Sequence, residues 1–91
     1  KAGVVGMTRS MALALAPHKI RVNAVAPGTT YTAQTRQQYS EDELSLLSDL
    51  VPTGEMAQPE DIADVILFLC TDASRMMTGE LVQANGGVYM G

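Results

Sequence analysis

The sequence is poor in the residues that build disulfides and metal sites. Its 91 residues contain one cysteine, one histidine and no tryptophan. Cys70 has no partner for an internal disulfide, and His18 has no second histidine with which to complete a metal site. We therefore expect a reducing compartment and no metal centre. The apolar residues around Cys70 predict a thiol buried in the core.

Positive charge is also scarce, and no hydrophobic run is long. Six lysines and arginines stand against ten aspartates and glutamates, which gives a net charge of −4. Because no basic run occurs, neither nucleic acid nor an anionic membrane is expected as a partner. The apolar stretches are too short to span a bilayer, and the first residues lack the layout of a signal peptide. The sequence thus predicts a cytoplasmic protein, and its length suits one small domain.

Residues 20–28, with the sequence IRVNAVAPG, form the stretch around which the rest is arranged. Their β-branched and small apolar side chains predict a buried strand over residues 20–26. Pro27 and Gly28 then end the strand, because proline has no N–H to donate and glycine tolerates a positive φ.

Helical patterns flank this strand. Residues 1–16 are apolar on most sides, which predicts a buried helix that ends at Pro17. Apolar residues at i, i+3, i+4 and i+7 predict a helix over residues 59–71, with Pro59 at its first position. A second strand is expected over residues 80–85. This order predicts an α/β fold with a parallel sheet, in which ligands lie beyond the carboxyl ends of the strands.

The segment between the first strand and the last helix is polar. Residues 29–39 show no strand pattern and are expected to form a surface segment. Ser40 and Glu43 have the spacing of a capping box, which predicts the start of a short amphipathic helix that ends at Pro52. Because polar or proline-bearing stretches border this helix, we expect residues 29–52 to move as a lid.

Six motifs occur in one order at the spacings of a known family. They are Lys1-Ala2-Gly3 at the start of a helix, RVNAVAPG at residues 21–28, Thr32 four residues later, PEDIA at residues 59–63, Thr78-Gly79 and Asn85-Gly86-Gly87. Over essentially the whole chain, they resemble the C-terminal half of a short-chain dehydrogenase/reductase. The resemblance implies the C-terminal part of a Rossmann-like, doubly wound parallel sheet, with two strands and about three helices, incomplete on its own.

The resemblance also implies a chemistry. Enzymes of this family transfer hydride between NAD or NADP and a carbonyl/alcohol substrate, and a Tyr-x-x-x-Lys pair carries the proton. Lys1 matches the lysine, whose charge lowers the tyrosine pKa and whose ammonium group holds the nicotinamide ribose. The tyrosine would lie four residues before Lys1, and the glycine-rich phosphate turn also falls outside these 91 residues. We therefore expect the chain by itself to be inactive.

The turn after the first strand resembles the family's loop over the nicotinamide and pyrophosphate. Pro27 and Gly28 would let the backbone approach the cofactor closely. The backbone of Thr30 would bond the carboxamide, and the Thr32 hydroxyl would donate to a phosphate oxygen. The alternative is an ordinary strand-ending turn with exposed threonines.

Residues 33–51 resemble the substrate-binding lid of the family. Tyr31, Arg36 and Tyr39 are the candidate substrate contacts, and a plain surface helix is the alternative interpretation.

Two hypotheses about function follow. In the first, the chain is part of an NAD(P)-dependent oxidoreductase that acts on a small carbonyl/alcohol substrate. In the second, it is an inactive fragment that only self-associates through apolar helix faces. In either case we expect a homo-oligomer, a dimer or a tetramer, because two strands leave apolar surface uncovered.

Overall fold

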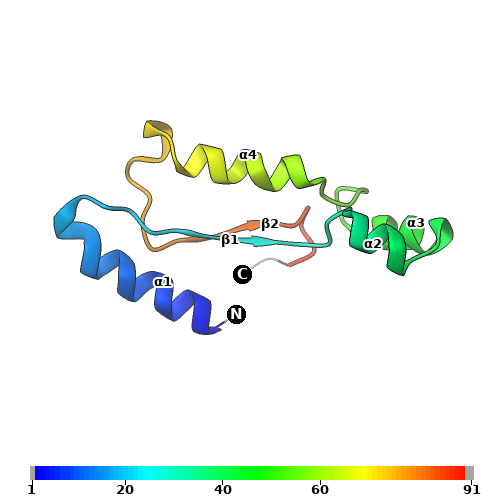
Figure 1. Ribbon diagram of the computed structural model, residues 1–91, viewed down its shortest axis with the longest axis horizontal. Coiled ribbons are helices and arrows are strands. Elements are labelled where there is room, and N and C mark those ends of the chain that lie inside the picture. Colours follow the sequence, from blue (N-terminus) through cyan, green and yellow to red (C-terminus); the bar gives the residue numbers. More distant parts are fainter. Residues whose placement is uncertain (1, 90–91) are drawn as a thin grey trace.

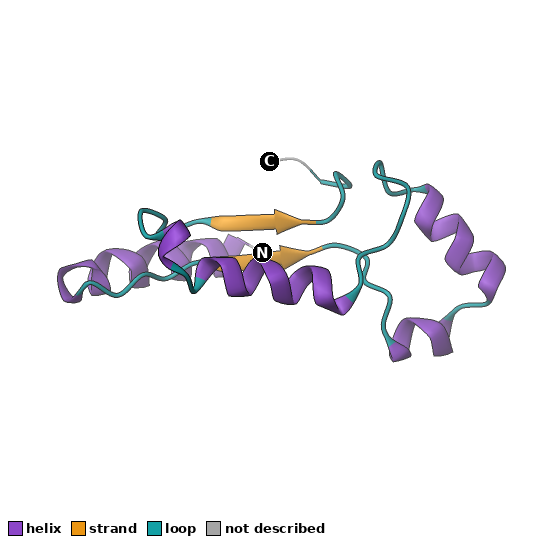
Figure 2. Ribbon diagram, turned by 90° about the horizontal axis from the view of Figure 1, so that it is seen from above, coloured by secondary structure: helices purple, strands orange, loops and turns teal. Residues whose placement is uncertain are grey.

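The computed structural model describes residues 2–89, which form helices on both sides of a short sheet (Figure 1). The elements are α1 (Ala2–Leu15), the 3₁₀ turn η1 (Ala16–His18), β1 (Ala24–Pro27), α2 (Ala33–Gln38), α3 (Glu41–Asp49), α4 (Pro59–Leu69), the 3₁₀ turn η2 (Asp72–Ser74) and β2 (Leu81–Ala84). Helix α4 lies along one side of the two strands and α1 along the other, while α2 and α3 lie beyond the strand ends (Figures 1 and 2).

The two strands are parallel, as the sequence predicted. Ala24 pairs with Leu81 and Pro27 with Ala84, and α4 lies between the two strands in the chain. Both strands run toward the end of the molecule that carries α2 and α3 (Figure 1). The prediction of an α/β fold with a partial parallel sheet is therefore confirmed.

The first strand is shorter than the predicted residues 20–28. It begins only at Ala24, because the residues before it bond to a loop instead of a strand. The Val22 N–H donates to the Thr78 hydroxyl at 3.1 Å. The Asn23 side chain donates to the Met77 carbonyl at 3.0 Å and accepts from the Glu80 N–H at 3.1 Å. Side chains thus occupy the Val22 and Glu80 N–H groups, while the Val22 carbonyl accepts from the Gly79 N–H of the loop at 2.7 Å.

Helix α2 was not predicted. It lies within residues 29–39, which the polar composition indicated only as a surface segment. Its start is set by Thr32 and Thr35, since each side chain bonds the backbone N–H of the other residue. The Thr-x-x-Thr spacing is a weak form of the capping box. It is the feature of the sequence from which the start of α2 could have been predicted.

The two predicted helix starts are confirmed in detail. The Ser40 hydroxyl accepts from the Glu43 N–H at 3.2 Å, and the Glu43 carboxylate accepts from the Ser40 N–H at 3.0 Å. Pro59 opens α4, where its missing N–H has no helical partner to lose. Helix α4 ends at Leu69, two residues before the predicted end.

Little of the described chain is buried. Its buried apolar side chains are Ala12, Leu44, Val51 and Met56. The radius of gyration is 15.5 Å, against about 12 Å for a compact domain of this length. The accessible surface is 6500 Å², against about 5,100 Å² for a compact monomer of this mass. The predicted homo-oligomer stays a prediction, and this exposed surface favours it.

Cys70 corrects one expectation. The thiol was predicted to be buried in the core, but it is exposed at the C-terminal end of α4. Three consecutive apolar residues of this helix, Ile66, Leu67 and Phe68, are also exposed. None of the helices within residues 2–89 combines the length and the hydropathy needed to cross a bilayer.

Candidate cofactor and substrate site

The predicted site residues gather where the two parallel strands end. Thr30 and Thr32 follow β1, and the turn at residues 85–87 follows β2. Helices α2 and α3 extend from this edge (Figure 1). Ligands of open α/β sheets bind outside the carboxyl ends of the strands, so this edge is the candidate site. Lys1, the predicted catalytic residue, lies outside the described residues.

Gly28 connects the two strand ends. Its N–H donates to the Ala84 carbonyl at 3.2 Å. A Cβ at Gly28 would lie 2.6 Å from the Asn85 Cβ and 2.9 Å from the Asn85 Cα. Backbone atoms cannot give way at that distance, so the close approach of the two strand ends requires a glycine here. The role expected for Gly28 beside a cofactor stays a prediction.

We expect Gly28→Ala to lower the free energy of unfolding by about 1–3 kcal/mol, the usual cost of overpacking. Urea unfolding of the protein that contains this chain measures the effect. Gly6→Ala in α1 is the control, because no atom lies within 4 Å of its added Cβ. Alanine in the helix interior should leave stability equal or raise it by up to about 1 kcal/mol. Equal unfolding midpoints for Gly28→Ala and the unmodified protein would contradict the packing argument.

Thr30 lies at the base of the lid, where the segment that enters the lid pairs with the segment that leaves it. The Tyr31 N–H donates to the Ala57 carbonyl at 2.7 Å, and the Ala57 N–H donates to the Thr29 carbonyl at 3.2 Å. This bridge uses the groups on either side of Thr30 and leaves the Thr30 N–H outside it. The Thr30 hydroxyl donates to the Gly28 carbonyl at 3.0 Å. The backbone of Thr30 is thus held in place with its N–H available to a ligand.

Thr32 has a structural task as the N-cap of α2. Its hydroxyl oxygen accepts from the Thr35 N–H at 3.2 Å. The Thr35 hydroxyl accepts from the Thr32 N–H at 2.7 Å and lies 3.2 Å from the Thr30 carbonyl. Thr35, which sequence reasoning missed, therefore ties the cap to the backbone of Thr30. An oxygen that accepts in a cap keeps its own proton, so the Thr32 hydroxyl is still able to donate.

The three candidate substrate residues do not form one cluster. The guanidinium carbon of Arg36 lies 5.4 Å from the centre of the Tyr31 ring, which is cation–π geometry. Tyr31 also lines a hollow of about 260 Å³, together with residues that include Ser48 and Gln58. Tyr39 is exposed at the C-terminal end of α2. The structure thus brings Tyr31 and Arg36 together and leaves Tyr39 apart.

The lid has a small core of its own. Leu44, Val51 and Met56 are buried, although all three lie in or next to the lid. The Thr53 N–H donates to the Gly86 carbonyl at 3.2 Å. Gly86 has φ +64°, and its added Cβ would lie 2.6 Å from Val51 Cγ1. The base of the lid is therefore packed against the turn after β2, and the expected lid motion stays a prediction.

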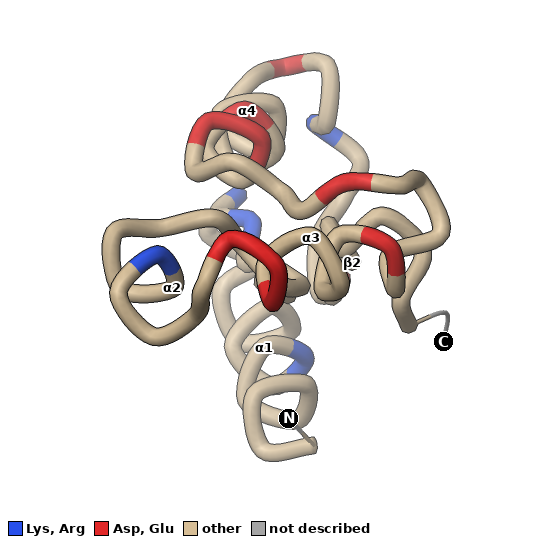
Figure 3. Tube along the Cα trace, turned by 90° about the vertical axis from the view of Figure 1, so that its right-hand side faces the viewer, with Lys and Arg blue, Asp and Glu red and all other residues tan. Residues whose placement is uncertain are grey.

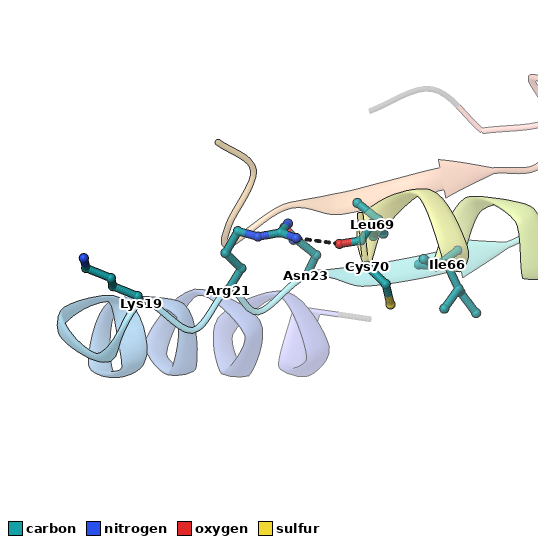
Figure 4. A pocket seen from close by; sticks show the side chains of 7 residues that line it. Lys19, Arg21, Asn23, Ile66, Leu69 and Cys70 are labelled. Atoms are coloured by element: carbon teal, nitrogen blue, oxygen red, sulfur yellow. Dashed lines mark hydrogen bonds between the residues drawn. The ribbon is translucent and has the colours of Figure 1, made fainter. Parts of the chain in front are cut away.

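A larger hollow, of about 730 Å³, lies at the other end of the sheet (Figure 4). Its lining includes Lys19, Arg21 and Cys70, which lie before β1 or at the end of α4. Most of this lining is remote from the carboxyl ends of β1 and β2, so this hollow is not the candidate site. No group of three or more His, Cys, Asp or Glu within residues 2–89 is placed to hold a metal ion.

Arg21 is the important residue that sequence reasoning missed. Its Nη2 donates to the Leu69 carbonyl at 2.8 Å, the bond drawn in Figure 4. Its Nη1 donates to the carbonyl of Ser74 at 2.9 Å and to that of Met77 at 3.2 Å. Arg21 thus bonds the last carbonyl of α4 and the loop that leads to β2. A charged residue inside an apolar strand pattern was the only signal of this role.

Comparisons with known proteins agree with this architecture. A family model described as enoyl-(acyl carrier protein) reductase matches residues 1–89. The chain is 42% identical over 89 residues to the 3-oxoacyl-[acyl-carrier-protein] reductase of Aquifex aeolicus, covering 98% of this chain and 36% of that protein. It is 39% identical over 90 residues to human (3R)-3-hydroxyacyl-CoA dehydrogenase, covering 99% of this chain and 34% of that protein.

A solved structure supports the same relationship. The crystal structure of a short chain dehydrogenase family protein from Francisella tularensis superposes with a TM-score of 0.83 at 37% identity, over 97% of this chain and 40% of that chain. The chain spans about a third of the length of the curated relatives it matches. The sequence motifs, the parallel strands and these matches show that the chain belongs to the short-chain dehydrogenase/reductase family.

Proposed function

We propose that the chain supplies part of the cofactor and substrate site of an NAD(P)-dependent oxidoreductase. This enzyme transfers hydride between the nicotinamide and a carbonyl/alcohol substrate. The observation that carries the proposal is the fixed Thr30–Thr32 backbone at the carboxyl edge of the sheet, in a chain of this family.

The residues at this edge suit a nicotinamide cofactor. The Thr30 N–H lies outside the bridge to Ala57 and is available to a carboxamide oxygen. The Thr32 hydroxyl keeps a proton for a phosphate oxygen. The bound cofactor supplies the hydride, and Lys1 supports the proton donor and the ribose. Gly28 and Pro27 place the turn that brings these groups to the edge.

The substrate proposal rests on the relatives. Those named above act on acyl thioesters, namely 3-oxoacyl-[acyl-carrier-protein] and 3-hydroxyacyl-CoA, according to their names. We propose a thioester with an oxygen function at its third carbon as the substrate class. Full-length protein mixed with NADH or NADPH and acetoacetyl-CoA should lose the fluorescence of the reduced cofactor. No loss with either cofactor, across a series of carbonyl compounds, would contradict the proposed function.

The placement of Thr32 is tested by Thr32→Asp. Aspartate is as good an N-cap as threonine, so stability should change by less than about 0.5 kcal/mol. Its carboxylate would face the cofactor phosphate, and like charges weaken binding, so the Kd for NAD(P)H should rise at least about tenfold. Cofactor fluorescence titration measures the Kd. The control is Thr32→Ser, which keeps both the cap and the donor and should bind normally. An unchanged Kd in Thr32→Asp would place the phosphate elsewhere.

A further inference from the structure

Arg36 stands alone as a positive charge. It is the only lysine or arginine between Arg21 and Arg75, a stretch that contains nine of the ten carboxylate side chains. Figure 3 shows the acidic residues on α3 and α4 and the basic position on α2. Within residues 2–89, however, the Arg36 guanidinium takes part in no ion pair or hydrogen bond, and its one interaction is with the Tyr31 ring.

Both members of this pair stand on fixed backbone. The Tyr31 N–H bonds the Ala57 carbonyl at 2.7 Å, which holds the ring at the base of the lid. The Arg36 N–H bonds the Thr32 carbonyl at 3.0 Å, so Arg36 follows the N-cap by one helical turn. The guanidinium therefore has a defined position close in sequence to Thr30 and Thr32, the proposed cofactor contacts.

The stacking arrangement leaves the donors of Arg36 available. A guanidinium over an aromatic face presents its N–H groups at its rim, where a planar oxyanion is able to accept two of them. An exposed arginine among many carboxylates would ordinarily pair with one of them. Here the guanidinium lies over the Tyr31 ring and pairs with no carboxylate of residues 2–89, so its charge is uncompensated.

We propose that Arg36, held by Tyr31, binds an oxyanion carried by the substrate. This inference rests on the proposed function and makes the substrate an anionic carbonyl compound. The oxyanion is a carboxylate on the substrate itself or a phosphate on its thioester carrier, since both have the acceptor geometry that a guanidinium fits. Arg36 is thus a residue that sets specificity and takes no part in proton transfer.

Three substrates with the same 3-oxo group separate these sources. Acetoacetyl-CoA carries phosphates, acetoacetate carries a carboxylate, and the N-acetylcysteamine thioester of acetoacetate carries no charge. In the full-length enzyme, Arg36→Gln should raise the KM for one charged substrate at least about tenfold, with kcat nearly unchanged. The KM for the neutral thioester should change less than about twofold. An effect on acetoacetyl-CoA alone identifies a phosphate, and an effect on acetoacetate alone identifies a carboxylate.

Matched variants control for loss of charge and loss of fold. Arg75→Gln removes the same charge from an exposed position in another part of the chain and should leave every KM unchanged. Tyr31→Leu, which removes the ring that holds Arg36, should reproduce part of the Arg36→Gln effect. Equal changes for the charged and neutral substrates, or no change for any, would overturn the proposal.

A binding measurement separates this proposal from the proposed function. Calorimetric titration with CoA and with acetoacetate needs no turnover. If no substrate oxidises the reduced cofactor, the proposed function fails. Weaker binding of either anion to Arg36→Gln than to the unmodified protein would then still support the anion site. Equal binding to both proteins would overturn it.

Discussion

Replacing Lys1 with methionine is expected to lower the kcat of hydride transfer by about 10²-fold or more, the usual contribution of acid–base catalysis. In the proposed function Lys1 is the partner of the catalytic tyrosine, and its positive charge would favour the ionised tyrosine. Without that charge the tyrosine pKa rises, so the pH at which alcohol oxidation becomes fast should move upward. The pH profile of kcat with the full-length enzyme measures both effects.

Two variants make the Lys1 result specific. Lys19→Met removes a lysine from the other end of the sheet and should leave kcat unchanged. Lys1→Arg keeps the charge but changes the shape of the group, so the pH profile should stay closer to that of the unmodified enzyme than in Lys1→Met. Full activity in Lys1→Met, with an unchanged pH profile, would show that Lys1 is an ordinary surface lysine.

Replacing Arg21 with methionine is expected to lower the free energy of unfolding by about 3 kcal/mol or more. Hydrogen bonds from a charged donor are stronger than neutral ones, and Arg21 makes several with the end of α4 and the following loop. Ser74, which accepts two of these bonds, is 1% exposed, so its groups have little access to water. Urea unfolding of the full-length protein measures the loss.

The shape of the side chain matters as much as its charge in this case. Arg21→Lys should recover only a minor part of the stability, because an ammonium group cannot bond carbonyls on both sides of a planar fork. Arg75→Met, at an exposed site, should change stability by less than about 0.5 kcal/mol. An unfolding midpoint for Arg21→Met equal to that of Arg75→Met would contradict the proposed link between β1 and α4.

Local patterns predicted the parts of the fold that local interactions determine. The Ser40 capping box and the proline that opens α4 depend on residues three or fewer positions apart, and both are confirmed. The parallel pairing of the strands followed from their order with the α4 pattern between them. Helix α2 was missed because its cap uses two threonines, a pair that occurs in many turns.

Features that depend on distant residues were not predictable from the chain. Arg21 bonds residues 48 to 56 positions away, and no spacing rule connects them. Gly28 has to be glycine because Asn85 lies against it, which only the paired strands reveal. Cys70 was predicted to be buried because its sequence neighbours are apolar, but it is exposed. The spacing of apolar residues does not show which face of a helix packs against another element.

The central claim is that a nicotinamide cofactor lies against the Thr30–Thr32 backbone. A crystal structure of the full-length protein with bound NAD(P) tests it most directly. The account predicts that the Thr30 N–H lies about 2.7–3.2 Å from the carboxamide oxygen, within ordinary hydrogen-bond range. It also predicts the Thr32 hydroxyl at a phosphate oxygen and Lys1 at the ribose hydroxyls. A cofactor bound away from this edge, with these groups facing water, would contradict the account.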